Sequence, residues 1–173
     1  MKKYNLLIVF VVLLFIGSSC SVRNEFYYKL AIDKVNEFRW NDTVNIKVSN
    51  EKCFCRKYGF YQFNYIGFLD DGELRKNDSI NYQKFKADPN NLHTDLVFSN
   101  KNHKHYDYLM FLSDIKGDTL CAEVFPYDLK RKETYEDYAS NNNYSYIYSF
   151  VFQNKRIKRM ATSKMAYNRF KVW

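Results

Sequence analysis

The spacing of apolar residues changes once along the chain, from steps of three and four to steps of two, and this change limits the possible folds most. The first pattern comprises Tyr27, Leu30, Ala31, Val35 and Phe38. Because residues three and four apart share one face of an α-helix, the pattern predicts a helix from about Glu25 to Phe38.

Apolar and polar residues then alternate, as they do in strands with one buried face. The alternating segments are Val44–Val48, Tyr61–Tyr65 and Tyr144–Phe152. The segment Tyr108–Leu112 is apolar on both faces, which predicts a central strand. Short turn sequences predict two hairpins, one from that strand to Thr119–Phe125 and one from Phe152 to a strand at Ile157–Tyr167.

These elements predict an α+β fold, in which the N-terminal helix packs on a mostly antiparallel sheet of five or six strands. An all-β sandwich is the alternative. The polar stretches Asn77–His105 and Asp128–Asn143 are expected to be loops, with room for a short charged helix at Leu129–Tyr138. Because no Pro-rich or Ser-rich linker divides the chain, we expect one globular domain over residues 25–173.

The first 19 residues have the pattern of a secretory signal peptide. Lys2 and Lys3 precede an apolar run of 11 residues, Leu6 to Ile16, and small residues follow it. A helix that spans a bilayer needs about 20 apolar residues, so a permanent transmembrane helix is the weaker interpretation. Export, followed by removal of residues 1–19, is therefore expected.

The end of this segment, Ile16-Gly17-Ser18-Ser19-Cys20, resembles the lipobox of bacterial lipoproteins. Gly17 stands where that family usually has Leu, Val or Ile. The resemblance implies that Cys20 is acylated, becomes the first residue of the mature protein and anchors it to a membrane through residues 20–24. Ser21 in place of Asp implies the outer membrane rather than the inner one.

Positive charge is concentrated at the C-terminal end. The chain has 27 Lys and Arg against 19 Asp and Glu, a formal net charge of +8. The segment from Lys155 to Trp173 contains no acidic residue and seven basic ones, Lys155, Arg156, Lys158, Arg159, Lys164, Arg169 and Lys171. The plainest interpretation is a solvated strand face. The functional alternative is contact of Lys155, Arg156, Lys158 and Arg159 with an anionic membrane or an acidic partner. Export argues against nucleic acid as a partner.

Three cysteines remain in the domain, and an odd number in an oxidising compartment leaves one thiol outside intramolecular pairing. Cys53 and Cys55 would point to the same side of an extended chain, near the upper limit of separation for a disulfide. We therefore expect Cys121 to pair with one of the two, and Cys53 and Cys55 compete for it.

No motif for catalysis, cofactor binding or metal binding is recognisable. Cys53, Cys55, His103 and His105 have the wrong spacing for a common zinc site. His93 with Asp95, or His105 with Asp107, offers a base and an orienting group without a nucleophile motif. We expect no cofactor, no metal and no catalytic residues.

Aromatic residues are unusually abundant, with 16 Tyr, 15 Phe and 2 Trp. A tyrosine stripe at Tyr144, Tyr146 and Tyr148 either belongs to the core or stacks on sugar rings or a partner chain; burial of the rings is the expected outcome. The sequence thus favours a non-catalytic, membrane-anchored envelope lipoprotein that binds a protein or glycan. The alternatives are an immunity or inhibitor lipoprotein and a periplasmic hydrolase.

Overall fold

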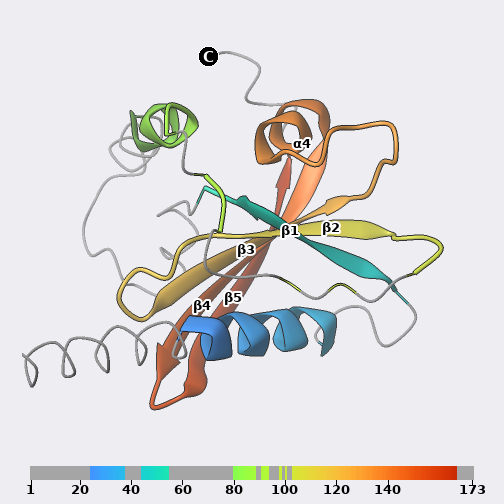
Figure 1. Cartoon of the computed structure of the whole chain (residues 1–173). Coiled ribbons are helices and arrows are strands. Elements are labelled where there is room, and N and C mark those ends of the chain that lie inside the picture. Colours follow the sequence, from blue (N-terminus) through green and yellow to red (C-terminus); the bar gives the residue numbers. More distant parts are fainter. Residues whose placement is uncertain are drawn as a thin grey trace, which may run out of the picture.

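A five-stranded sheet forms the centre of the protein (Figure 1). The structure is a computed structural model, and it describes residues 24–37, 44–54, 80–88, 91–93, 98, 100 and 103–166. The strands are β1 (Ile46–Lys52), β2 (Tyr108–Leu112), β3 (Thr119–Pro126), β4 (Tyr144–Gln153) and β5 (Arg156–Ala166). They lie in sequence order across the sheet. β1 runs parallel to β2, and the other neighbours are antiparallel.

A helix over residues 24–37 covers one face of the sheet (Figure 1). The predicted stripe supplies its contacts, because Tyr27, Ala31 and Val35 are buried among sheet residues. The Tyr27 ring stacks on Phe152 of β4, with the ring centroids 4.5 Å apart. Tyr28 is buried as well, and its hydroxyl donates to the carbonyl oxygen of Ser113 at 3.0 Å. The predicted helix is thus confirmed, although Phe38 lies outside the described residues.

Two shorter helices cover the other face, a helix over residues 80–86 and α4 (Tyr135–Asn141) (Figure 1). The alternate side chains of β2 and β3 pack beneath them, with Phe111 in contact with the rings of Phe125, Tyr135 and Tyr138. Helices thus cover the side chains on both faces of β2 and β3. The sequence predicted this two-sided burial for β2. The α+β prediction is confirmed, and the sandwich alternative is wrong because helices, rather than a second sheet, cover the described faces.

Two tight turns fix the register of the hairpins. The turn between β2 and β3 contains Gly117 at φ 65°. The Lys116 N–H donates to the Thr119 carbonyl oxygen, and the Thr119 N–H donates to the Lys116 carbonyl oxygen. Asn154 and Lys155, at φ 50° and 58°, both adopt the left-handed conformation between β4 and β5. Two such residues form a type I′ turn, whose twist matches that of the strands it joins.

The loop predictions need correction in two places. Residues 80–86, inside the expected loop Asn77–His105, form a helix whose Tyr82 and Phe85 pack on Phe54. Its other residues are mostly polar, so the three-residue apolar spacing was too short to identify. The short helix expected at Leu129–Tyr138 begins later, because the Thr134 side chain accepts from the Asp137 N–H and caps α4 there. The predicted strand Tyr61–Tyr65 lies outside the described residues.

The two-sided core gives a direct stability prediction. Replacing Phe111 with Ala removes a fully buried ring from between β2 and α4. We expect the free energy of unfolding to fall by about 3 to 5 kcal/mol. Chemical denaturation followed by circular dichroism measures the change. The matched control is Leu129→Ala, because that side chain is exposed; equal losses in both variants would contradict the described packing.

Candidate functional site

The predicted lipid attachment site, Cys20, lies outside the described residues, as does the whole signal peptide, residues 1–19. Among the described residues, no helix has the length and apolar character needed to cross a membrane. Acylation of Cys20 therefore stays a prediction from the sequence.

The structure shows the bonding state of two of the three cysteines in the domain. Cys121 on β3 is disulfide-bonded. Cys53 carries a reduced, buried thiol whose Sγ donates to the Cys121 carbonyl oxygen at 3.6 Å. Cys53 is therefore not the disulfide partner of Cys121. The competing candidate, Cys55, lies outside the described residues.

The structure does not bring the three histidines together. His93 is 8 % exposed, and its Nε2 lies 3.0 Å from the carbonyl oxygen of Leu112 beneath the first helix. His103 and His105 lie on the loop before β2, where the His105 side chain is 68 % exposed and 3.5 Å from Asp107. No group of three potential metal ligands occurs among the described residues. His93 thus lies against a backbone carbonyl, and His105 lies beside a carboxylate.

Burial sets the protonation of His93. It lowers the pKa of His93 below 6.5; the hydrogen bond to Leu112 and the Asp114 charge act in the opposite direction, and Lys52 adds to the lowering. A neutral imidazole at Nε2–H can donate to the Leu112 carbonyl, which makes His93 a packing residue with a single polar bond. The Tyr28 and Phe98 rings lie edge-on to it, with centroids 5.2 and 5.4 Å away.

One buried acidic residue, Glu123 at the centre of β3, was not among the residues predicted from the sequence. Its side chain is 2 % exposed and accepts hydrogen bonds from the Tyr135 hydroxyl at 2.6 Å and the Ser145 hydroxyl at 2.5 Å. The signal was the single charge in an otherwise apolar segment, since a buried carboxylate needs such donors. The cluster joins α4 to β3 and β4, and we interpret it as structural.

A second polar cluster stands at the start of α4. Glu133 accepts from Lys47 Nζ and from the Tyr127 hydroxyl, each at 2.6 Å. Partial burial acts to raise the pKa of Glu133, but these two hydrogen bonds outweigh it and hold the pKa below 4.5. In turn the hydrogen bond to Glu133 raises the pKa of Tyr127 to about 12. Nearby, Glu51 accepts from the Tyr135 N–H at 2.6 Å, so carboxylates fasten the helix start to β1.

The tyrosine stripe of β4 is only partly core. Tyr148 is fully buried, whereas Tyr144 and Tyr146 are half-buried on the same face. Lys164 of β5 lies over both, with Nζ 4.2 Å from the Tyr144 ring centroid and 5.7 Å from that of Tyr146. Both rings therefore have a cation–π partner within the protein.

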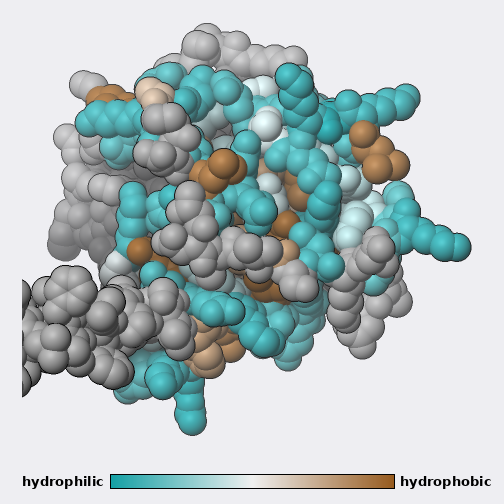
Figure 2. Space-filling model, in the orientation of Figure 1, coloured by the Kyte–Doolittle hydropathy of each residue, from teal (hydrophilic) through white to brown (hydrophobic). Residues whose placement is uncertain are grey.

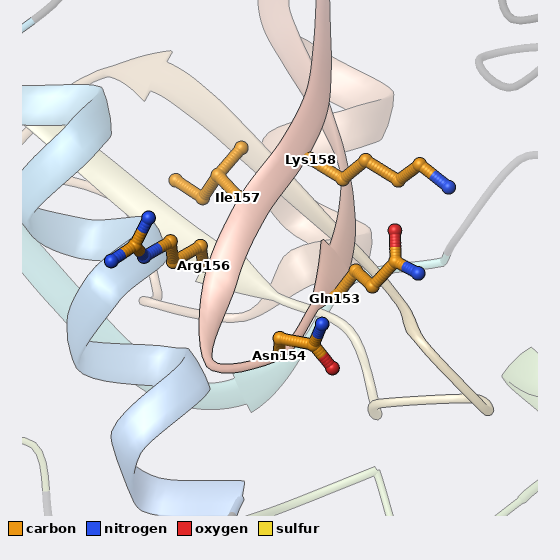
Figure 3. Close-up of a pocket in the computed structure, with 5 residues that line it drawn as sticks. All are labelled: Gln153, Asn154, Arg156, Ile157 and Lys158. Carbon is orange, nitrogen blue, oxygen red and sulfur yellow. The ribbon is translucent and has the colours of Figure 1, made fainter.

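The predicted basic residues gather at the β4–β5 hairpin. Lys155, Arg156, Lys158 and Arg159 are exposed on the turn and the first residues of β5. A shallow hollow surrounds the turn, lined by Gln153, Asn154, Arg156, Ile157 and Lys158. Figure 3 shows Arg156 on one side of the hairpin and Lys158 with Gln153 on the other, so positive charge surrounds the tip. Arg169 and Lys171 lie outside the described residues.

Apart from the grey residues, the face seen in Figure 2 is largely hydrophilic, with small, separate apolar patches. Among the described residues the exposed large apolar side chains are Phe26, Ile80, Leu92 and Leu129. Of these, Phe26 belongs to the first described turn of the first helix, next to Tyr27, which stacks on Phe152 of β4. The basic hairpin is the strongest candidate for a functional surface.

Comparison of the chain with protein-family models, curated proteins and solved structures gives no match.

Removal of the Tyr135 hydroxyl tests whether the hydrogen bonds to Glu123 stabilise the folded protein. Tyr135→Phe leaves a buried carboxylate with one donor fewer, and hydrogen bonds to charged groups contribute about 1.5 to 3 kcal/mol. We expect a loss of that size in the free energy of unfolding, measured by urea denaturation. Tyr144→Phe, on a half-buried ring, is the control. A Tyr135→Phe protein as stable as the wild type would contradict the structural role.

His93 should also make stability depend on pH. Because its folded-state pKa lies below the unfolded value of about 6.5, the unfolded chain binds the proton first. Its contribution to stability is therefore complete above pH 6.5 and is lost as the pH falls, by at most about 1.4 kcal/mol per pH unit. His93→Gln should flatten thermal stability between pH 7.5 and 5.5, whereas His105→Gln should not. An unchanged slope in His93→Gln would refute this assignment.

Proposed function

We propose that the protein is a lipid-anchored lipoprotein of the bacterial cell envelope, with a non-catalytic binding or assembly role close to the membrane. The observation that carries the proposal is the short distance between the lipobox-like segment and the fold. The described part of the first helix begins at residue 24, so only residues 21–23 separate it from Cys20 in the sequence. Four Cα-to-Cα steps span at most about 14 Å.

This distance determines how the domain would be presented. Several acyl chains on one residue give a stable membrane anchor, since each buried CH₂ contributes about 0.8 kcal/mol. A tether of three residues would hold the sheet domain at the lipid surface rather than on a long stalk. Because Ser21, rather than Asp, follows Cys20, the resemblance to lipoproteins favours the outer membrane.

The polar groups of the described residues support a binding role over catalysis. Glu123, Glu133 and Glu51 accept short hydrogen bonds that hold α4 on the sheet. His93 bonds to a backbone carbonyl under the first helix. These side chains are engaged in hydrogen bonds within the fold, which supports a structural role for each of them.

An immunity or inhibitor lipoprotein is the second candidate, and the basic hairpin favours it. A projecting hairpin with exposed cations is suited to an acidic toxin or hydrolase. Affinity capture of the anchored protein from its own envelope separates the two roles. An acidic toxin or hydrolase as the captured partner supports the inhibitor role, and an envelope assembly protein or glycan supports the first.

Removal of the acylated sulfur tests the anchor. Cys20→Ser should abolish metabolic labelling with radioactive palmitate and move the protein from the membrane to the soluble or unprocessed fraction. Cys53→Ser is the matched control, because that buried thiol belongs to the core and should not affect labelling. Membrane fractionation and acyl labelling that are unchanged in Cys20→Ser would refute the proposal.

A further inference from the structure

The start of the first helix and the tip of the β4–β5 hairpin lie at the same end of the protein. The stacking of Tyr27 on Phe152 joins them, and Phe152 stands one residue before the end of β4. Figure 1 shows the first turn of the helix beside the hairpin, while α4 lies at the opposite end of the sheet. Any anchor attached just before residue 24 therefore emerges next to the basic hairpin.

We propose that this end of the protein, the basic end, docks on the anionic headgroups of the membrane that holds the lipid anchor. The basic end comprises Phe26, Lys155, Arg156 and Lys158. The inference rests on the proposed lipid anchor at Cys20, because only the anchor determines which end meets the bilayer. The ligand is a lipid surface that carries negative charge.

The charges of the hairpin suit such a surface. Lys155, Arg156 and Lys158 are exposed and lie within four residues of one another. No Asp or Glu occurs in β4, the turn or β5. The acidic residues near this end are Glu25, beside Phe26 on the helix, and Asp118, whose carbonyl oxygen accepts from the Phe152 N–H at 2.8 Å. Near an anionic bilayer each basic residue strengthens binding by roughly fivefold, and the effect falls off within a Debye length of about 8 to 10 Å. A tether of at most about 14 Å would keep the basic end at a distance from the bilayer that is comparable to the Debye length.

Phe26 gives the surface an apolar element. The ring is 43 % exposed at the first turn of the helix, beside the buried Tyr27. Phe, like Trp and Leu, is common on the apolar face of helices that lie at the boundary between headgroups and acyl chains. An exposed aromatic next to cations, at the anchored end, is the combination found on proteins that lie on a membrane surface.

Lysine footprinting tests the docking with the mature, acylated full chain. The protein is reconstituted on vesicles of phosphatidylcholine alone or mixed with phosphatidylglycerol, and lysines are acetylated and measured by mass spectrometry. We expect Lys155 and Lys158 to react several-fold more slowly on the anionic vesicles, with the protection lost at high salt. Lys130 and Lys132 are internal controls, because they are exposed on the segment that leads into α4, and α4 lies away from the hairpin (Figure 1).

A charge variant tests the cause of the docking. Lys155→Gln, Arg156→Gln and Lys158→Gln together should weaken the surface contact by about a hundredfold, at roughly fivefold each. The readout is hydroxyl-radical oxidation of Phe26, which should be protected on anionic vesicles in the wild type and exposed in the variant. The matched control, Lys104→Gln with Lys130→Gln and Lys132→Gln, removes the same charge from the far end and should keep the protection.

Three results would overturn the docking proposal. One is equal reactivity of Lys155 and Lys158 on the two kinds of vesicle, and another is protected Phe26 in the hairpin variant. The third is protection of the two lysines in native envelopes but not on anionic vesicles, which would assign the hairpin to an acidic protein. Failure of the protein to float with either kind of vesicle would instead reject the anchor, and with it the docking that depends on it.

Discussion

Burial of the central strands on both faces is the constraint on which the rest of the structure depends. β2 and β3 carry apolar side chains in both directions, so each face of the sheet must be covered. The first helix covers one face, and α4 with the helix over residues 80–86 covers the other. α4 is only seven residues long and buries little apolar surface. Polar contacts therefore help to hold it on the sheet. The carboxylates Glu123, Glu51 and Glu133 hold it in place.

The same constraint explains how much of the fold the sequence could predict. The stripe from Tyr27 to Val35 and the alternation from Tyr144 to Phe152 are long enough to identify a helix and a strand, and both were right. The helix over residues 80–86 was missed because Tyr82 and Phe85 alone face the core. Its position depends on contacts with Phe54, about 30 positions earlier, and local spacing cannot report such contacts. The start of α4 depends likewise on one hydroxyl, at Thr134.

The candidate site was predictable only in part. The basic run Lys155 to Arg159 could be identified from composition, but its nearness to Tyr27 on the first helix depends on the Tyr27–Phe152 stack, which no sequence pattern encodes. Glu123 could have been noticed as a lone charge in an apolar strand, although its partners Tyr135 and Ser145 lie 12 and 22 positions away. Conversely, His93 had the residue type expected of a catalytic base, but folding placed it against a backbone carbonyl.

The pairing of β4 with β5 contains a bulge, which affects how copies of the protein in the same membrane would meet. Val151 pairs with Arg159 and Phe152 with Ile157, which leaves Lys158 as an extra residue in a strand at the margin of the described sheet. A bulge bends such a margin, and a charged residue there discourages another chain from adding itself as a further strand. If many copies shared a bilayer, diffusion in two dimensions would bring these margins together often. We therefore expect Lys158 to help keep neighbouring copies from joining into aggregates.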